Sequence, residues 1–498
     1  MFLVKDLYQA YYTKSEPIVR YMVSQLDINE NDKILEPCGG DGVFIDEIIN
    51  SYKNVKIDIF ELNPSSYSSL ISKYANCESI NINLSDTLLD NDLDLKAKFG
   101  GYYDKIIANP PYGAWLEYDK RKLLKKKYLN FYVKESYALF LSRAINLLKP
   151  KGKLVFIIPD TYLNLHMHKT LRHQILTETK INEIALFPSS FFPGVNFGYA
   201  NLSIISLEKT SNSNEALKNN FTIYTDYISV NNLGNLNVSS YCLTQHQILN
   251  NPDYAFLVAK NPLVIKCMQE TKDKIGDMAD CVTGFYSGND KVFLKVLSKD
   301  VKNGKKYEVV DTDKIYKQNC NQTLLNGIKG EQYFIPILKG GNGKFLKEDY
   351  WFINWSYDSV MHYKTDAKAR FQNSKYYFKK GIAVPMISSS RITASLITNK
   401  IFDQSIVGIF PHNEDYLFYL LAFFNSNTCN LLIRTINPSA NNPANYIKKI
   451  PIILPSESDL LFINKFISDI LQQLMSKKLF DKKWLVEIDN YFKNIYGF

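Results

Sequence analysis

The chain has 498 residues, 46% of them hydrophobic and 22% charged, a globular composition with enough material for two hydrophobic cores. Its formal net charge of +9 suits a polyanionic partner but does not by itself establish one. No apolar stretch reaches the ~18 residues that a membrane span needs, and the first residues lack the pattern of a secretory signal. We therefore expect a cytoplasmic protein of two domains that does not associate with a membrane.

The cysteine and histidine patterns give no indication of a metal site. The seven cysteines are scattered and never form a C-x-x-C pair, which is typical of a reduced intracellular protein without structural zinc. His166, His168 and His173 are close in sequence, but no further ligand is suitably spaced to join them. We expect no metal cofactor.

Seven apolar runs in the first 210 residues alternate with amphipathic stretches, which predicts strands that cross over through helices into a doubly wound parallel sheet. The runs cover residues 33–37, 55–62, 79–83, 103–109, 153–159, 181–187 and 202–208. A polar, Asn- and Ser-rich tract follows and predicts a connection between domains. We accordingly expect an α/β domain over 1–210, a linker over 211–245 and an α+β domain over 246–498.

Open α/β sheets bind ligands at the carboxyl ends of their strands, and three predicted strand ends carry suitable residues. The first strand runs into "EPCGGDGVF", where Gly40 and Gly42 allow the backbone to approach a ligand closely. Glu61 ends the second strand, roughly 20 residues beyond the glycine turn, where a carboxylate can accept both hydroxyls of a ribose. Asp86 follows the third strand, where it can accept a hydrogen bond from the exocyclic amine of an adenine ring. Together these residues predict a nucleoside site.

The fourth strand ends in the tetrapeptide NPPY, residues 109–112. The prolines restrict the backbone and remove two donors, so that the Asn109 side-chain oxygen and the Pro110 carbonyl can act as fixed acceptors. Two acceptors that grip one conjugated amino group favour tetrahedral geometry and stabilise the positive charge that grows on nitrogen as it attacks. Tyr112 offers a flat surface on which a flipped base can stack.

With these motifs in this order, the sequence resembles the γ-class, S-adenosylmethionine (AdoMet)-dependent DNA adenine-N6 methyltransferases. The segments that carry the resemblance are "YYTKSEPIVRYMV", "LEPCGGDGVF", "FELNP", "SDTLL", "YDKIIANPPYG", "KGKLVFIIPDTYL" and "FFPGVNFGYANLSII". The resemblance implies a Rossmann-like, seven-stranded AdoMet methyltransferase domain followed by an α+β target recognition domain. Two departures concern the cofactor: Thr87 stands where many relatives carry an aromatic or apolar residue, and the threonine motif is one residue longer.

The resemblance also implies roles for individual residues. The residues implied to surround AdoMet are Thr13, Glu36, Pro37, Gly40, Gly42, Glu61, Asp86, Asn109 and Pro111. Asn109, Pro110 and Tyr112 are implied to be catalytic and to hold the target adenine. Phe192 is expected to clamp the flipped base from the opposite face, with Phe197 as the alternative.

The part after residue ~245 resembles the family's target recognition domain more loosely. Lys339, Lys344, Arg391 and Asn442 are the residues that we expect to contact DNA phosphates or base edges. The basic run 119–127 follows NPPY and is interpreted either as a grip on the DNA backbone or as a solvated face.

Other functions share parts of this pattern. NPPY also occurs in methyltransferases that act on release-factor glutamine and, in variant form, on rRNA guanine N2, but those proteins are generally shorter and lack a large C-terminal domain. Cytosine-N4 methyltransferases more often have Ser or Asp before the prolines, and an inactive DNA-binding subunit would not need the intact tetrapeptide. We therefore expect a monomer that methylates double-stranded DNA and carries no nuclease of its own. A separate restriction endonuclease in the same system remains an open alternative.

Overall fold

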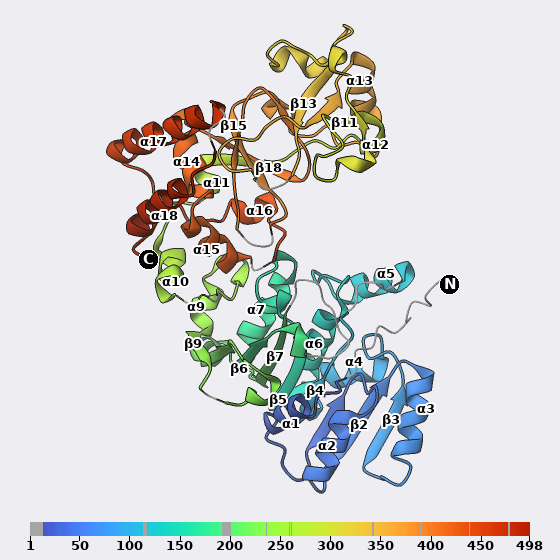
Figure 1. Ribbon diagram of the computed structural model, residues 1–498. Helices are drawn as coiled ribbons and strands as arrows, with labels where there is room; N and C mark the ends of the chain where they lie inside the picture. The colour runs from blue at the N-terminus through green and yellow to red at the C-terminus, as the bar shows by residue number, and fades with distance from the viewer. Residues whose placement is uncertain are drawn as a thin grey trace. The chain divides into compact units, whose positions relative to one another are not determined.

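The computed structural model describes residues 13–112, 117–191, 201–235, 237–257, 259, 261–340, 343–388, 391–437, 439–476 and 479–498. The chain divides into two compact units, residues 1–258 and 259–498 (Figure 1). The predicted boundary was therefore placed too early, and the reason lies in the first unit's sheet.

The first unit is built on a nine-stranded sheet in the order β3-β2-β1-β4-β5-β7-β6-β8-β9. Its strands are β1 Lys33–Glu36, β2 Lys56–Glu61, β3 Ile80–Leu84, β4 Tyr103–Ala108, β5 Leu148–Pro159, β6 Thr179–Phe187, β7 Leu202–Lys209, β8 Asn220–Thr225 and β9 Ser239–Thr244. Each of the seven predicted runs thus forms a strand. β1 to β5 pair in parallel, whereas β7 is antiparallel to both of its neighbours. The carboxyl ends of β1, β2, β3 and β4 therefore meet at one edge of the sheet.

Most helices of this unit connect successive strands, whereas α1 precedes β1 and α9 follows β9. They are α1 Glu16–Ser24, α2 Val43–Ser51, α3 Pro64–Lys73, α4 Asn91–Lys98, α5 Tyr118–Lys127, α6 Ser136–Leu147, α7 Lys169–Glu178, α8 Ser213–Lys218 and α9 Gln245–Leu249. Right-handed crossovers place α2 and α3 on one face of the sheet and α4 and α6 on the other, because the strand order reverses between β1 and β4. This reversal point is where open α/β sheets form their ligand crevice.

The predicted linker over 211–245 is wrong, since this segment folds as α8, β8 and β9 and extends the sheet. Gln245 fixes it in place with a completely buried side chain. Its Oε1 accepts from the Ile181 amide at 2.8 Å, and its Nε2 donates to the carbonyls of Leu176 and Thr179, each at 2.9 Å. The sequence did not reveal these two strands because most of their residues are polar and at least partly exposed, with only Phe221 and Ile223 of β8 buried.

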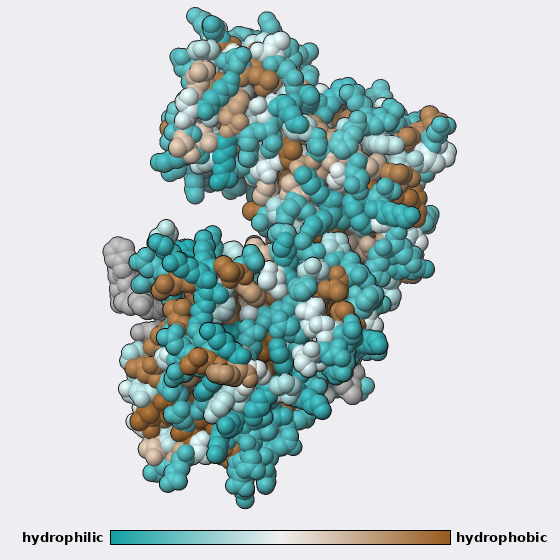
Figure 2. Space-filling view, turned by 180° about the vertical axis from the view of Figure 1, so that it is seen from behind, coloured by the Kyte–Doolittle hydropathy of each residue, from teal (hydrophilic) through white to brown (hydrophobic). Residues whose placement is uncertain are grey.

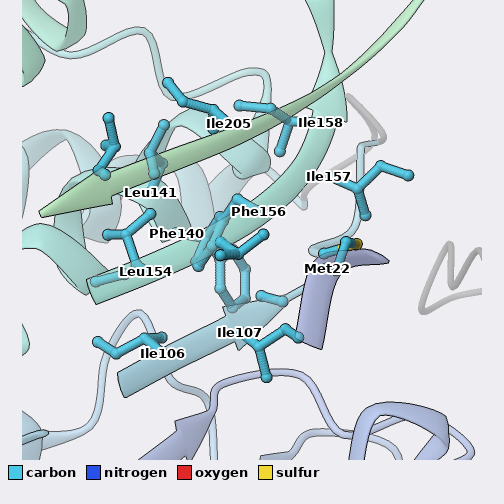
Figure 3. Close-up of a cluster of buried hydrophobic side chains, with 14 of the residues drawn as sticks. Met22, Ile106, Ile107, Phe140, Leu141, Leu154, Phe156, Ile157, Ile158 and Ile205 are labelled. Atoms are coloured by element: carbon cyan, nitrogen blue, oxygen red, sulfur yellow. The ribbon is translucent and has the colours of Figure 1, made fainter. Parts of the chain in front are cut away.

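The core of the first unit lies around β4 and β5, whose apolar residues are buried on both faces of the sheet. Figure 3 shows side chains of this cluster from both strands and from three other elements: Ile106, Ile107, Leu154, Phe156, Ile157, Ile158, Phe140 and Leu141 of α6, Met22 of α1 and Ile205 of β7. Since these strands end at NPPY and at Pro159, a rigid, well-packed base supports the edge of the sheet where the predicted site lies.

The second unit combines helices with two separate sheets. Its five-stranded sheet has the order β12-β11-β14-β13-β17, and its four-stranded sheet has the order β10-β18-β15-β16. The strands are β10 Ala279–Thr283, β11 Leu294–Val296, β12 Glu308–Val309, β13 Phe334–Leu338, β14 Trp351–Asn354, β15 Gly381–Pro385, β16 Ser395–Ile397, β17 Ile401–Phe402 and β18 Ile406–Pro411. The helices are α10 Pro262–Glu270, α11 Ile275–Met278, α12 Asp290–Phe293, α13 Tyr357–Thr365, α14 Leu417–Phe424, α15 Asn427–Ile436, α16 Ala444–Ile447, α17 Glu457–Met475 and α18 Lys483–Tyr496. Aromatic side chains dominate the core beneath the five-stranded sheet, with Trp355 completely buried among them.

The face drawn in Figure 2 is predominantly hydrophilic, with apolar side chains in small scattered patches. In the described part of the chain, no single helix has the length and apolarity to cross a membrane. One sharply bent pair, Glu414–Phe424 and Asn427–Ile436, meets those criteria only when its two helices are taken together.

Candidate active site

The glycine turn after β1 opens the site. Gly40 and Gly42 have φ angles of 52° and 73°, in the left-handed region that glycine tolerates best. Gly42 is also the N-cap of α2, and a Cβ at this position would lie 2.5 Å from the Tyr74 hydroxyl oxygen. That hydroxyl donates to the Gly42 carbonyl at 2.8 Å and holds the turn against α3. The turn is therefore fixed in a shape that leaves backbone rather than side chains at the carboxyl end of β1.

Glu36, the last residue of β1, is a buried carboxyl group with an unused acceptor. Only 2% of its surface is exposed, and its Oε2 atom has no hydrogen-bond partner among the described residues. Burial raises the pKa of Glu36 well above its usual range, and the negative charges of Glu61 and Asp46 raise it further. A buried acceptor of this kind is stabilised by a ligand that brings a donor or a positive charge.

Glu61 already holds part of the turn. Its Oε2 accepts from the Gly40 amide at 2.8 Å, and its Oε1 accepts from the Asn63 amide at 2.7 Å. Each carboxylate oxygen can accept more than one hydrogen bond, so both remain able to receive a ribose hydroxyl. Glu61 therefore links the shape of the glycine turn to the position predicted for the ribose.

Asp86, predicted to face the adenine of the cofactor, has two protein partners. Its Oδ1 accepts from the Leu88 amide at 3.0 Å, and its Oδ2 forms an ion pair of 2.6 Å with Lys120 of α5. The neighbouring Thr87 is buried, and its hydroxyl donates to the Pro37 carbonyl at 2.6 Å. The departure at Thr87 thus has a structural role, since it joins the segment after β3 to the turn after β1.

Asn109 lies at the end of β4 with its side-chain amide held from both sides. Nδ2 donates to the Thr13 hydroxyl at 2.9 Å, and Oδ1 accepts from the Tyr112 hydroxyl at 2.6 Å. The Tyr112 hydroxyl also lies 3.1 Å from the carbonyl oxygen of Ile157 on β5. In this arrangement the amide nitrogen faces Thr13 and the amide oxygen faces Tyr112. A carboxamide oxygen has two acceptor positions, so Oδ1 can accept a second hydrogen bond from a ligand.

The rest of NPPY is held by the sheet and by α6. Pro110 is buried, and the carbonyl of Pro111 accepts from the hydroxyl of Ser136, the first residue of α6, at 2.6 Å. Tyr112 is only 6% exposed and packs into the core of the first unit, so its side chain anchors the tetrapeptide to that core. A stacking contact between Tyr112 and a flipped base stays a prediction. Phe192 and Phe197, the two predicted clamps, lie outside the described residues.

Sequence reasoning missed two residues of this site. Lys120 belongs to a basic run, which gave no reason to single out one lysine as the partner of Asp86. Ser136 stands 25 residues beyond Pro111, and nothing in the sequence pairs the two. Both contacts depend on how α5 and α6 return to the sheet edge, which only the three-dimensional structure shows.

In the second unit, the four residues predicted to contact DNA have protein partners. Lys339 lies 2.9 Å from a carboxylate oxygen of Asp290 and 3.3 Å from one of Asp403. Arg391 forms an ion pair of 2.7 Å with Asp489. These pairs tie loops of the unit together, and a DNA contact by either cation stays a prediction.

Asn442 and Lys344 complete that set. Asn442 is completely buried, and its Oδ1 accepts from Arg434 at 3.3 Å, which gives it a place in the unit's interior. The Lys344 ammonium lies 4.9 Å from the centre of the Phe480 ring. Burial lowers the pKa of Lys344, and the positive charges of Arg391 and Lys482 lower it further. Lys344 therefore lies in a locally cationic part of the second unit, whereas Asn442 does not have the exposure that a base contact needs.

Part of the first unit is similar to enzymes of restriction–modification systems. Residues 41–192 match the family model described as Eco57I restriction-modification methylase. Type II methyltransferase M.AccI of Acinetobacter calcoaceticus is 33% identical over 164 residues, which cover 30% of this chain and 29% of that protein. Type II methyltransferase M.HincII of Haemophilus influenzae is 28% identical over 212 residues, 39% of each chain. The matched segment is therefore similar to Eco57I-type restriction–modification methylases, and the matches span less than half the length of these relatives.

Two solved structures resemble the chain over both units. The DrdV–DNA complex matches 94% of this chain and 57% of its own, with a TM-score of 0.55 and 12% sequence identity. A nuclease-deletion mutant of the type ISP restriction-modification enzyme LlaGI, in complex with a DNA substrate mimic, matches 94% and 55%, with a TM-score of 0.54 and 13% identity. At such low identity the likeness concerns the fold alone, and it extends through the second unit.

Proposed function

We propose that the protein is a site-specific DNA methyltransferase that transfers a methyl group from AdoMet to N6 of an adenine flipped out of double-stranded DNA. The observation that carries the proposal is the Asn109 amide at the end of β4, oriented by Thr13 and Tyr112 beside the glycine turn of β1. The match of residues 41–192 to a restriction–modification methylase family supports the same reaction class.

The residues around the turn fit AdoMet. The unpartnered Oε2 of Glu36 suits the cationic methionine part, Glu61 suits the ribose hydroxyls, and Asp86 suits the adenine amine. Thr13, Pro37, Gly40, Gly42 and Pro111 complete the proposed lining. When bound, AdoMet supplies an electrophilic methyl group on a sulfonium, so the protein needs no covalent intermediate and no metal for the transfer.

The chain's own contribution to the reaction is positioning and electrostatics. Asn109 Oδ1 and the Pro110 carbonyl each accept one hydrogen of the target amine, so that the nitrogen lone pair points toward the methyl donor. As positive charge grows on that nitrogen, both acceptors interact with it more strongly, which stabilises the transition state more than the ground state. Because the acceptors are already fixed by Thr13, Tyr112 and the two prolines, little reorganisation is required.

The second unit is proposed to recognise the DNA sequence. Its chain length and separate core suit an independent domain, and the fold likeness to two enzymes of restriction–modification systems includes this unit. We further propose that the protein acts as a cytoplasmic monomer. Whether a separate restriction endonuclease accompanies it is decided by its cellular context and not by this chain.

A direct assay tests the proposed reaction. Purified protein is incubated with double-stranded DNA and isotopically labelled AdoMet, the DNA is digested to nucleosides, and the labelled nucleoside is identified by mass spectrometry. We expect N6-methyladenine. Labelled N4-methylcytosine would show that the same site methylates cytosine instead of adenine. Label found only in rRNA or in a release-factor peptide would contradict a DNA substrate.

A further inference from the structure

Helix α5, Tyr118–Lys127, carries an unusual concentration of positive charge close to NPPY. Its ten residues contain six cationic side chains and one acidic side chain, Asp119. Like charges three and four positions apart destabilise a helix, and Lys122 stands at these spacings from Lys125 and Lys126. Such a helix must gain its stability from packing on one face. An anionic partner on the other face lowers the repulsion between its positive charges.

One face of α5 is fixed to the segment that follows β3. Lys120 pairs with Asp86 at 2.6 Å, and Lys127 pairs with Asp94 at 2.7 Å. Leu124 is completely buried between these two lysines, and the Tyr128 hydroxyl donates to the Leu88 carbonyl at 3.0 Å. This face therefore has a structural explanation that needs no ligand.

The three lysines on the opposite face of α5 have no structural role of this kind among the described residues. Lys122, Lys125 and Lys126 are exposed, and among the described residues none of them has an acidic partner. They lie on a helix whose position is fixed by its other face, so their charges are held together rather than dispersed on mobile loops.

The position of α5 relative to the candidate site is restricted by the chain itself. Glu117, the N-cap of α5, is five residues beyond Tyr112. Five residues span at most about 18 Å when fully extended. At about 3.4 Å per nucleotide step, this reach to Glu117 corresponds to roughly five base pairs of duplex DNA. Lys126 lies nine helical residues further along, about 14 Å at 1.5 Å per residue. Figure 1 shows α5 standing out from the body of the first unit.

We propose that the exposed face of α5, formed by Lys122, Lys125 and Lys126, binds the sugar–phosphate backbone of the DNA beside the target adenine. This inference rests on the proposed function and adds a DNA-binding surface in the first unit, separate from the sequence-recognising role of the second. The three ammonium groups contact phosphates and carry no base specificity, so they hold the duplex while the target base leaves the stack.

Duplex DNA fits this surface better than an anionic membrane. A membrane-binding helix buries its apolar face in lipid, whereas the fully buried Leu124 of α5 faces the protein. Tyr118 and Leu123 of α5 are exposed, but they stand five positions apart and so lie on different sides of the helix rather than forming an apolar stripe.

The test compares the wild type with the triple variant Lys122→Gln, Lys125→Gln, Lys126→Gln. Binding to a fluorescent duplex that carries the methylated sequence is followed by anisotropy over a series of KCl concentrations. The slope of log affinity against log salt changes by about 0.9 for each phosphate contact, so the triple variant should lose between two and three from the slope. At physiological salt we expect its affinity for DNA to fall by roughly 10- to 100-fold, with unchanged AdoMet affinity and unchanged melting temperature.

A matched control removes three positive charges far from the carboxyl ends of the strands. Lys53 precedes β2, Lys56 is its first residue, and Lys151 lies near the start of β5; all three are exposed. Changing these three to Gln should leave the salt dependence as in the wild type. An equal loss of slope in this control would show that total charge rather than α5 matters, and the proposal would then fail.

The remaining outcomes distinguish a failure of the α5 surface from a failure of the proposed methyltransferase function. If the wild type methylates DNA but the α5 variant keeps the full salt slope, the DNA surface is wrong and the methyltransferase stands. If the wild type neither binds nor methylates DNA, the proposed function fails first. If the α5 variant loses binding to vesicles of anionic phospholipid while its DNA binding is unchanged, the helix is a membrane-binding element instead.

Discussion

Replacing Tyr112 with phenylalanine separates two roles that the tetrapeptide combines. The hydroxyl of Tyr112 donates to Asn109 Oδ1 at 2.6 Å, while the ring is almost completely buried. The substitution Tyr112→Phe keeps the ring and removes the hydroxyl, with its contacts to Asn109 Oδ1 and to the Ile157 carbonyl. A change in kcat therefore reports on the support that this hydroxyl gives to NPPY. Tyr112→Ala is a poorer test, since the loss of a buried aromatic side chain costs about 3–5 kcal/mol of stability.

The expected magnitude follows from the lost contact. One intramolecular hydrogen bond contributes about 0.5–1.5 kcal/mol, and if this contribution is felt in the transition state, kcat falls by about 2- to 13-fold. The affinities for AdoMet and DNA should change by less than about twofold, because the hydroxyl is not among the groups proposed to bind either substrate.

Single-turnover methylation of a duplex with labelled AdoMet measures this rate directly. Tyr103→Phe is a suitable control. Tyr103 lies on β4, at the opposite end of the strand from Asn109, and its hydroxyl donates to Asp58 at 2.7 Å. We expect Tyr103→Phe to lower stability without lowering kcat. A Tyr112→Phe enzyme with wild-type kcat would refute the positioning role of the hydroxyl.

Three further predictions follow from buried groups in the first unit. Glu36 has a pKa raised above 4.5, so the native state keeps the proton that the unfolded state releases, and stability is lost as pH rises through the raised pKa. Glu36→Gln should therefore stabilise the ligand-free protein above that pH. In calorimetry, AdoMet binding to the wild type should release a proton and strengthen as pH rises through that pKa, and both effects should be absent in Glu36→Gln. Gly42→Ala places a Cβ 2.5 Å from the Tyr74 hydroxyl at a φ of 73° and should cost about 1–3 kcal/mol in denaturant unfolding, whereas an unchanged midpoint would contradict the strain. Gln245→Ala leaves buried backbone groups of β6 and α7 unpaired, and a loss below about 1 kcal/mol would argue that 211–245 is a dispensable linker after all.

The sequence predicted the sheet better than its edges. Of strands β1 to β7, all but the edge strand β3 contain buried apolar runs, and the structure forms a strand at each predicted run. β8 and β9 were missed because they are half exposed at the end of the sheet, so their composition resembles that of a loop. Gln245 shows the difficulty, since its buried side chain joins α9 to α7 and β6, which lie more than about 60 residues earlier in the sequence.

The candidate site was predictable to the extent that it depends on strand ends. The order of strands brings the turn after β1, Glu61, Asp86 and Asn109 to one edge, as expected for an open α/β sheet. The ion pair of Asp86 with Lys120 was not predictable, because it depends on the path of a helix rather than on a local motif. In the second unit, Asn442 was expected to contact DNA, yet it is buried. The sequence could not predict this, because a single polar residue does not show whether its loop faces solvent or the interior.

The most direct test of the methyltransferase function is single-molecule sequencing of DNA from cells that lack native methylation. One strain expresses the wild-type protein, and its twin expresses Asn109→Ala, which should retain AdoMet binding but lose the fixed acceptor for the target amine. The proposed function predicts N6-methyladenine at one short sequence motif in the first strain and none in the second. Methylation that persists in the Asn109→Ala strain would contradict the proposed role of NPPY, and the absence of any modified base in the wild-type strain would contradict DNA as the substrate.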